Sequence, residues 1–559
     1  GDAVPLVVTA IETNGAKVAA GTVKYVLDNF GKRKFSEGTA DLTKENPFTV
    51  TATRKDPGVV RLTLNAKGAK TLNWGVAFSP EKIRTGSARP ADFDAFWENA
   101  IAELDRTVPE DAKCEHDPTL DSPNFTGYRV SFATYGKNRR VYGFLSVPKT
   151  GKAPYPVRIT VPGAGRGSIG CARATGCISL LMNVHDYAPK ATSAEQQAAY
   201  EEENARWGAP YGVKWYFHSG IQKSREDYFY YGAILGINRA VNWLAQRDDV
   251  DLKDFTYRGQ SQGGAFGIYL AALNKHITAA TISEPAITDT LAYKAGRKSG
   301  WPTITEVQPD KSPANIAAIE ERMRYFDTVN FVPRITCPTR WLAGWVDQLC
   351  PAECVHAGYN RLNPTTDRRI VDGADLGHGI PRDVYLRYEN LLTASWEPIP
   401  TVLVGDDPAD RIAADEFVKY YEKMAGLRPE VKVEGVGVGP FVRIGKSFAT
   451  GLEFDEKFDS YRIKSEKKDG HWSLLLAGGN ARSTMYAVYE FFKSQGCRWF
   501  WDGDVVPKTG VVDLSGQDVY EVSQFEWRAT RYFAHRGLRR FSAEMWGPED
   551  WKREIDWCL

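Results

Sequence analysis

The sequence lacks an excess of charge of either sign. It holds 71 lysine and arginine residues against 70 aspartate and glutamate residues. Proteins that bind nucleic acid or an anionic membrane usually carry a clear basic excess. The balance gives no reason to expect nucleic acid as a partner, and it favours an uncharged substrate.

It also lacks a long apolar run. No stretch approaches the roughly 18 residues that span a bilayer. The first residues, Gly1-Asp-Ala-Val-Pro5, do not form a basic segment followed by an apolar one. We therefore expect no membrane span.

Cysteine is scarce as well, and eight cysteines in 559 residues are too few for a disulfide framework. Cys171 and Cys177 bracket a short loop that a bridge could close, the alternative being buried free thiols. Cys350 and Cys354 lie four residues apart, but no second pair follows at zinc-site spacing. We predict no metal and no cofactor.

A chain of 559 residues is too long for one hydrophobic core, and three or four domains are expected at roughly 100 to 200 residues each. Residues 1–85 hold short alternating segments at 5–9, 22–26, 48–52 and 59–64, separated by turn residues. This spacing predicts a small β-sandwich, of the immunoglobulin-like type.

Residues 86–398 alternate helices with strands. Apolar periodicity predicts helices from Arg89 to Leu104 and from Tyr228 to Leu244. Strands are predicted at 128–132, 140–147 and 157–161. The order predicts an α/β-hydrolase domain with a largely parallel sheet and active-site loops at its carboxyl edge.

A second α/β pattern follows. A strand at 401–404, a helix at 408–421 and a helix near 483–495 predict a smaller α/β domain over 399–522. Residues 523–559 begin a further domain pattern. The sequence ends in the middle of a segment with helical periodicity, and we interpret this end as a truncation.

The most informative segment is Gly259-Gln-Ser261-Gln-Gly263, which follows a short strand and precedes a helix. A serine between two glycines in this pattern is typical of a nucleophile elbow, where a sharp turn presents the hydroxyl to substrate. The bare pattern is moderately specific, so its partners must support it.

A nucleophilic serine needs a histidine base, which in α/β-hydrolases follows it in the chain. The histidines after Ser261 in the same domain are His276, His356 and His378. His276 lies too close to Ser261 for a strand carrying the acid to intervene, and His356 lies in a predicted helix where a surface histidine is expected. His378 follows a strand in a glycine-bearing loop, as the base should.

The acid that orients the base is expected at the end of an intervening strand. Asp347 leaves the carboxyl end of the strand at 339–344 and is our candidate. Asp372 and Asp375 are rivals, but both are too near His378 in sequence, and we interpret them as solvated loop carboxylates.

An oxyanion needs two backbone N–H donors. Gln262, directly after the nucleophile, supplies one. The glycine-rich loop Pro162-Gly-Ala-Gly-Arg-Gly167 supplies the other, through Ala164. That loop has neither the lysine-serine ending of a phosphate loop nor dinucleotide spacing, so we do not expect a nucleotide.

Residues 92–392 resemble the acetyl xylan esterase and cephalosporin C deacetylase family of carbohydrate esterases. The motifs that carry the resemblance are Asp92-Phe-Asp-Ala-Phe-Trp97, Tyr230-Tyr-Gly232, Arg258-Gly-Gln-Ser-Gln-Gly-Gly264, Tyr325-Phe-Asp327, Asp347-Gln-Leu-Cys-Pro351, Tyr359-Asn360 and Gly377-His378. The resemblance implies a triad of Ser261, Asp347 and His378, oxyanion donors at Gln262 and Ala164, and removal of acetyl groups from sugars.

Two positions depart from the family pattern. Pro162-Gly-Ala164 stands where the family usually has His-Gly-Tyr, which removes an aromatic wall of the pocket, and Gly379 replaces a frequent glutamate. The backbone donor survives the first change, whereas the acyl and sugar preferences can differ.

Residues 400–522 resemble the non-catalytic α/β domain that precedes the barrel of α-glucuronidases. The marks are at 413–417, 478–492 and 496–500, and residues 531–557 resemble the start of the barrel itself. The resemblance implies a bifunctional esterase and glycoside hydrolase whose glycosidic carboxylates lie beyond Leu559. We interpret Glu544, Glu549 and Glu554 as solvated or structural.

We therefore predict a secreted or periplasmic serine esterase, its signal peptide removed, which takes O-acetyl groups from plant polysaccharide or oligosaccharide. One alternative is hydrolysis of methyl or other esters on pectic or xylan side chains. Another is an inert glycan-binding scaffold, in which the triad order would have no reason to persist. The expected partner is an acetylated carbohydrate, and the oligomeric state stays open.

Overall fold

The computed structural model describes residues 3–13, 15–172, 175–379, 381–433, 439–455, 457–468, 470–500 and 503–524. The chain divides into two compact units, Gly1–Tyr385 and a second that begins at Leu386, within helix α7 (Arg382–Ala394). The predicted barrel start falls almost wholly beyond residue 524, outside the described residues, as do the three glutamates named above.

The first unit begins with two antiparallel sheets. One pairs β1 with β4, and the other has the order β3-β2-β5-β6. The strands are β1 (Ala3–Val8), β2 (Thr22–Asp28), β3 (Lys34–Asp41), β4 (Phe48–Thr53), β5 (Gly58–Ala66) and β6 (Leu72–Phe78). A small core that includes Leu27, Val50 and Leu62 fills this part. Sequence reasoning missed β3 because Lys34-Phe-Ser-Glu-Gly-Thr-Ala-Asp41 carries few apolar residues.

A buried ion pair links these strands to the following α/β part of the unit. Arg54, after β4, contacts Glu353 in helix α6 (Ala352–Tyr359), and their side chains are 3% and 0% exposed. The same Glu353 oxygen accepts from the backbone N–H of Val59 at 2.8 Å. The other oxygen, Oε2, has no hydrogen-bond partner among the described residues. The charge of Glu353 therefore depends on Arg54.

Replacing Arg54 with methionine is expected to lower the free energy of unfolding by about 3–5 kcal/mol, because it leaves a buried carboxylate without its cation. Urea denaturation of the whole chain measures the loss. Arg158→Met is the matched control, since Arg158 pairs with Asp254 at side-chain exposures of 44% and 40% and should cost under about 1 kcal/mol. Equal losses in the two variants would contradict the assignment.

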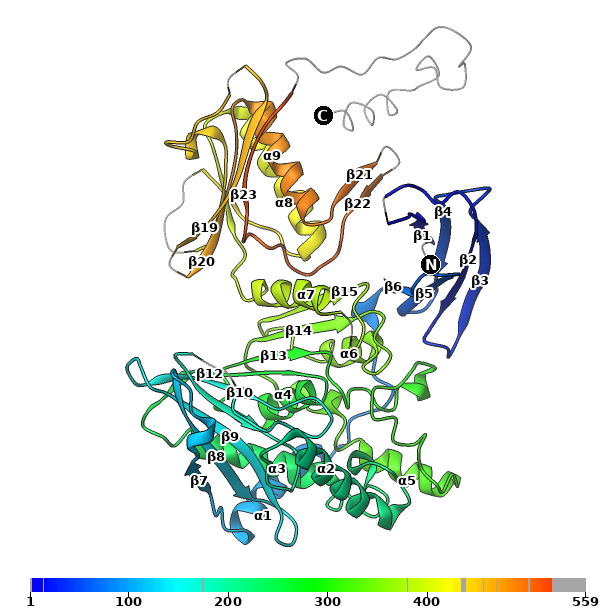
Figure 1. Ribbon diagram of the computed structural model, residues 1–559, viewed down its shortest axis with the longest axis vertical. Coiled ribbons are helices and arrows are strands. Elements are labelled where there is room, and N and C mark those ends of the chain that lie inside the picture. Colours follow the sequence, from blue (N-terminus) through cyan, green and yellow to red (C-terminus); the bar gives the residue numbers. More distant parts are fainter. Residues whose placement is uncertain are drawn as a thin grey trace. The chain divides into compact units, whose positions relative to one another are not determined.

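The α/β part is built on a nine-stranded sheet of order β15-β14-β13-β12-β10-β11-β9-β8-β7, whose strands lie side by side in Figure 1. The strands from β15 to β11 run parallel, and β9, β8 and β7 continue antiparallel. Their bounds are β7 (Lys113–His116), β8 (Phe125–Ala133), β9 (Arg140–Pro148), β10 (Tyr155–Thr160), β11 (Ile178–Met182), β12 (Val250–Gln260), β13 (Ala279–Ser283), β14 (Thr339–Gly344) and β15 (Arg368–Gly373). The expectation of a largely parallel sheet is confirmed.

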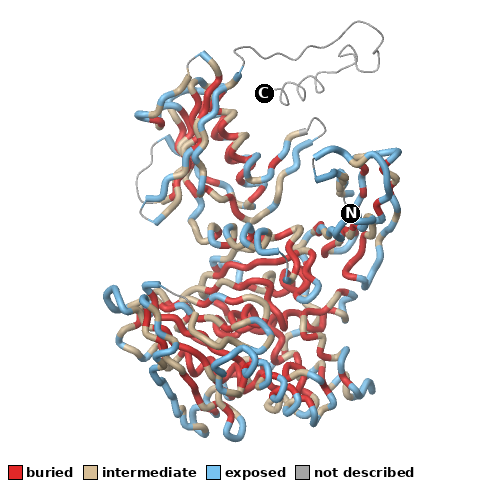
Figure 2. Tube along the Cα trace, viewed as in Figure 1, coloured by how far each residue is buried: buried red, intermediate tan, exposed pale blue. Residues whose placement is uncertain are grey.

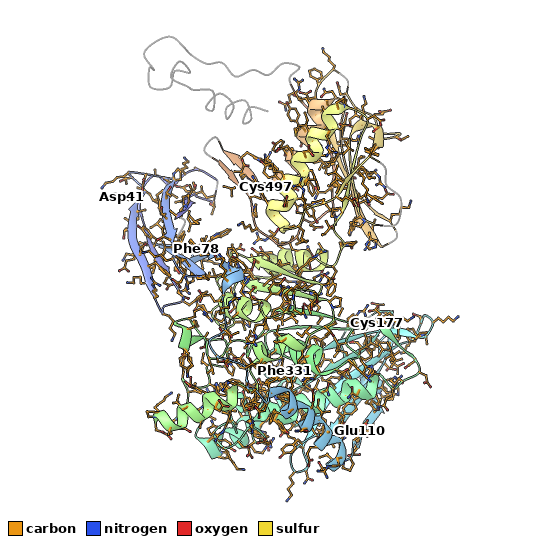
Figure 3. The ribbon with its side chains drawn as sticks, turned by 180° about the vertical axis from the view of Figure 1, so that it is seen from behind. Asp41, Phe78, Glu110, Cys177, Phe331 and Cys497 are labelled. Carbon is orange, nitrogen blue, oxygen red and sulfur yellow. The ribbon has the colours of Figure 1, made fainter. Side chains whose placement is uncertain are left out.

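The remaining helices of this part are α1 (Phe93–Thr107), α2 (Ser193–Gly208), α3 (Phe229–Leu244), α4 (Gln262–Leu273) and α5 (Pro313–Met323). The two predicted helices correspond to α1, which begins later and ends one turn later than expected, and α3. The central strands and α3 are buried along most of their length, as Figure 2 shows. Phe331, labelled in Figure 3, packs edge-on against Phe93 of α1 and Tyr269 of α4.

The second unit holds a sheet of order β17-β16-β18-β20-β19-β23 with two long helices. Its elements are β16 (Thr401–Val404), α8 (Pro408–Ala425), β17 (Val431–Lys432), β18 (Phe441–Ile444), β19 (Ser460–Lys468), β20 (His471–Gly478), α9 (Ala481–Ser494), β21 (Arg498–Phe500), β22 (Gly503–Val505) and β23 (Asp518–Val522). The predicted strand and both predicted helices are confirmed. In the described part of the chain, no helix is both long and apolar enough to span a membrane.

Candidate active site

Ser261 lies at the sharp turn between β12 and α4. Its backbone has φ 57° and ψ −122°, a strained conformation for a residue with a side chain. The turn is possible only because its neighbours are glycines. A Cβ on Gly263 would lie 2.1 Å from the carbonyl oxygen of Val161, and a Cβ on Gly259 would lie 2.5 Å from the Gly263 backbone. The elbow expected from the sequence is present.

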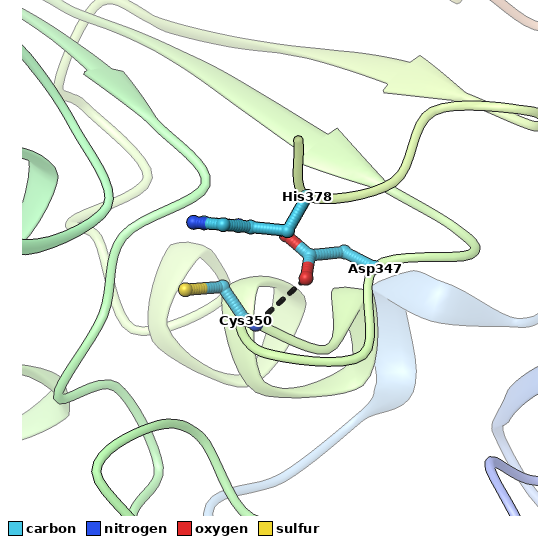
Figure 4. A group of neighbouring side chains, drawn as sticks. All are labelled: Asp347, Cys350 and His378. Atoms are coloured by element: carbon cyan, nitrogen blue, oxygen red, sulfur yellow. Dashed lines mark hydrogen bonds and ion pairs between the residues drawn. The ribbon is translucent and has the colours of Figure 1, made fainter. Parts of the chain in front are cut away.

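Ser261, His378 and Asp347 form one hydrogen-bonded chain. His378 Nε2 lies 3.2 Å from Ser261 Oγ, and His378 Nδ1 lies 2.8 Å from Asp347 Oδ2. Asp347 follows β14 and His378 follows β15, and these strands are neighbours at the carboxyl edge of the sheet. Figure 4 shows the imidazole of His378 against the Asp347 carboxylate. This is the geometry of a nucleophile, a base and an orienting acid.

Asp347 is held rigidly. Its side chain is fully buried, and Oδ1 accepts hydrogen bonds from the backbone N–H groups of Leu349 at 2.7 Å and Cys350 at 2.9 Å. The other oxygen is left for His378. Burial alone would lower the pKa of His378, but the hydrogen bond and the charge of Asp347 raise it above its ordinary 6.5.

Two sequence interpretations near the triad are wrong. His356 was expected at the surface, yet it is buried on α6, with Nε2 2.8 Å from Asp372 Oδ1. Asp372 was interpreted as a solvated loop carboxylate, yet it lies on β15 and also accepts from Trp345 Nε1 at 2.8 Å. Both belong to a structural hydrogen-bond cluster behind the triad. His276 lies just beyond α4, as expected.

The two candidate oxyanion donors come from different segments of the chain. Gln262 is the first residue of α4, and Ala164 lies in the exposed loop after β10. Neither backbone N–H has a hydrogen-bond partner among the residues that the structure describes. The Gln262 side chain is fixed, because its Oε1 accepts from Tyr216 and Tyr230 at 2.7 and 2.6 Å. Its Nε2 donates to the carbonyl of Pro162 at 3.3 Å, which ties the elbow to the loop.

Side chains missed by sequence reasoning brace this loop. His185 Nε2 lies 2.7 Å from the Gly165 carbonyl, and its Nδ1 lies 2.5 Å from buried Glu203. Gln196 donates to the Arg166 carbonyl at 2.6 Å. The only signal for His185 was its position shortly after a strand. Beside the braced loop lies a pocket of about 470 Å³, lined by Thr160, Pro162, Gly163, Ala164, Gly165, Arg166, Gly167, Ser168 and Leu181.

Cys350 also reaches the triad. Asp347, Cys350 and His378 each place one possible ligand atom within 4.8 Å of the other two, a spacing that could hold a metal ion. In Figure 4 the Cys350 side chain and the imidazole of His378 point to the same side. However, Asp347 and His378 are already hydrogen-bonded to each other, and burial raises the pKa of the Cys350 thiol well above its usual range. The arrangement suits a triad better than a thiolate metal site. Cys171 and Cys177 are both free thiols.

Sequence reasoning also missed Glu284. This residue follows β13, the strand between those that deliver Ser261 and Asp347, and its carboxyl is buried beside Asp347. The signal was available, because Ala279-Ala-Thr-Ile-Ser283 is a short apolar strand followed directly by an acid. A carboxylate at that place in the sheet reaches the same edge as the triad.

Comparison with known proteins gives a consistent picture. The family model described as acetyl xylan esterase matches residues 80–381. The acetyl esterase Axe7A of Xylanibacter ruminicola is 30% identical over 345 residues, which cover 60% of this chain and 74% of that protein.

Two solved structures are also similar. The acetyl xylan esterase of Paenibacillus sp. R4 has a TM-score of 0.46 at 20% identity and covers 56% of this chain and 98% of its own. The acetyl xylan esterase 1 of Thermoanaerobacterium sp. JW/SL YS485 has a TM-score of 0.45 at 18% identity, covering 57% and 98%.

Proposed function

This chain belongs to the acetyl xylan esterase family, and from that premise we propose that it removes O-acetyl groups from carbohydrate through an acyl-enzyme on Ser261. The observation that carries the assignment of roles is the hydrogen-bonded chain from Asp347 through His378 to Ser261. It ends at a strained elbow that presents the hydroxyl beside two backbone N–H groups available to an oxyanion.

In acylation, Ser261 Oγ attacks the acetyl carbonyl carbon while His378 Nε2 takes the hydroxyl proton. The carbonyl oxygen becomes an oxyanion, which the N–H groups of Gln262 and Ala164 stabilise. His378 then gives its proton to the sugar oxygen as the bond between that oxygen and the acetyl carbon breaks. Asp347 holds the imidazole in the required tautomer and stabilises its charged form.

In deacylation, water replaces the sugar. His378 takes a proton from water as its oxygen attacks the acetyl carbon, a second oxyanion forms, and the bond to Ser261 Oγ breaks. The proton on His378 returns to the serine, and acetate leaves. Two backbone donors fixed before the reaction need no rearrangement in either step.

The substrate is proposed to be an acetylated plant polysaccharide or oligosaccharide. The balanced charge of the chain supports an uncharged ligand. Ala164 offers only a methyl group where the family usually has an aromatic side chain, which leaves room beside the oxyanion loop for groups other than acetate. That room is the reason to test methyl esters of pectic or xylan side chains as a second candidate.

The flanking regions are proposed to have supporting roles. Residues 1–85 form an immunoglobulin-like sandwich that buttresses the esterase domain of residues 86–398. Residues 399–522 form an accessory domain of the kind that precedes a glycoside hydrolase barrel in other proteins. A secreted or periplasmic location agrees with a polysaccharide substrate.

Release of acetate and methanol from a panel of acetylated xylan, acetylated pectin and methylated pectin tests the proposal. We expect acetate from the acetylated polymers and little methanol from any. Xylan deacetylated by alkali is the matched control and should yield nothing. Methanol without acetate would replace the deacetylase assignment by the methyl-ester one, and release of neither would reject both.

A further inference from the structure

Glu284 has an unusual environment for a carboxylate. Its side chain is fully buried, and its Oε2 accepts a hydrogen bond from Gln260 Nε2 at 2.6 Å. The other oxygen, Oε1, is buried without a hydrogen-bond partner among the described residues. Buried polar atoms in native proteins nearly always have a partner, so this oxygen needs an explanation.

The backbone and the close packing around Glu284 fix the position of its side chain. It has φ 42°, in the left-handed region that a residue with a side chain seldom adopts, and its N–H donates to the carbonyl of Leu342 on β14 at 2.9 Å. Its Oε1 lies against Gly344, where a Cβ would come within 2.9 Å of the oxygen. Strain and close packing of this kind are retained where a side chain must occupy one position.

The group that faces Glu284 is Asp347. Asp347 donates its backbone N–H at 3.1 Å to the carbonyl of Gly344, the residue against which Glu284 Oε1 lies, and the negative charge of Asp347 acts on Glu284. Two carboxylates cannot bond to each other, because both are acceptors, but a protonated carboxyl can donate to a carboxylate. A proton on Glu284 Oε1 therefore supplies the missing partner and relieves the repulsion between the two groups.

The electrostatics agree with that proton. Burial first, and then the negative charge of Asp347, raise the pKa of Glu284 from its ordinary 4.5 to about 8. The titratable groups that face it are Asp347 and Cys350 from the segment after β14, and His378 from the loop after β15. From β12 it meets the uncharged amide of Gln260.

We propose that Glu284 is a positioning residue, which as a neutral carboxylic acid donates a hydrogen bond to Asp347 and holds it against His378. The effect of Glu284 on the rate of acetate release rests on the proposed function. When Glu284 loses its proton, the hydrogen bond is lost and two like charges repel inside the core. Activity is therefore expected to fall as the pH rises through about 8, whereas at low pH it falls because His378 becomes protonated and can no longer accept the serine proton.

Two variants distinguish a role for Glu284 as an uncharged hydrogen-bond donor from a role in which its side chain only fills space. In Glu284→Gln, the amide oxygen still accepts from Gln260 and the amide N–H₂ still donates to Asp347, without a titrating proton. We expect kcat/KM within about threefold of the wild type at pH 7, with the fall near pH 8 abolished. In Glu284→Leu, Asp347 loses the donor, and we expect kcat to fall by about 10- to 100-fold.

Infrared difference spectroscopy gives a readout that does not depend on activity. The wild type at pH 6.5 should show the carbonyl stretch of a protonated carboxylic acid that Glu284→Gln lacks, and this band should disappear by pH 9.5. Three results would each overturn the proposal. The first is absence of the band in the wild type, and the second is a Glu284→Gln variant as impaired as Glu284→Leu. The third is a fall in activity near pH 8 that is unchanged in Glu284→Gln. A wild type that releases no acetate but shows the band would reject the proposed function alone.

Discussion

Ser261→Ala is expected to lower kcat for acetate release by about 10⁴-fold or more, leaving only the catalysis that binding and the oxyanion donors provide. The variant loses the oxygen that attacks the acetyl carbon and that lies 3.2 Å from His378 Nε2. The strained backbone is unchanged, since alanine needs no more room than serine at the elbow. Initial rates on an acetylated xylan oligosaccharide measure the loss.

A folded but inactive variant is the informative result. The unfolding temperature should match the wild type within a few degrees, because only one oxygen atom is removed. Ser224→Ala is the control, since its hydroxyl donates to Asp227 outside the site, and its rate should stay within about twofold of the wild type. Persistent acetate release by Ser261→Ala would remove Ser261 from the mechanism.

The triad could be predicted from the sequence because it depends on chain order. In a parallel α/β sheet, residues that follow successive strands gather at one edge, so a serine, an acid and a histidine in the loops after β12, β14 and β15 must meet. Local patterns, apolar periodicity and the serine between two glycines, predicted helix α3 and the elbow. These features are local patterns with one structural solution.

The environment of the triad could not be predicted, because it depends on which side chains meet across strands. His356 looks like a surface residue on a short helix, and only the fold shows that Asp372 on β15 lies beside it. Likewise, the pairing of His185 with Glu203 joins residues on different elements. Such partners have no fixed sequence spacing, so periodicity carries no information about them.

The relation of the small strands to the active site was also hidden. Gly75 on β6 donates its N–H to the carbonyl of Ala374 at 2.7 Å, four residues before His378. A Cβ on Gly75 would lie 2.4 Å from the Cβ of Trp345, two residues before Asp347. The N-terminal strands therefore pack directly against the loops that carry the acid and the base, and support their positions.

Asp347→Asn is expected to lower kcat by about 10⁴-fold while leaving the fold intact. Asp347 Oδ1 accepts from two backbone N–H groups, so the amide oxygen of asparagine must take that place. The amide N–H₂ then faces His378 Nδ1 and donates to it. The proton of the imidazole is forced onto Nε2, which faces Ser261 Oγ and can no longer accept the serine proton.

The matched control is Asp372→Asn. Asp372 is closer to His378 in the chain than Asp347 is, but its carboxylate accepts from Trp345 and lies beside His356, so the loss in kcat should be below about tenfold. Comparing kcat for the two variants at the same pH, with unfolding temperatures as a check, measures the difference. A loss below tenfold in Asp347→Asn, or an equal loss in Asp372→Asn, would show that the tautomer of His378 is set by another group.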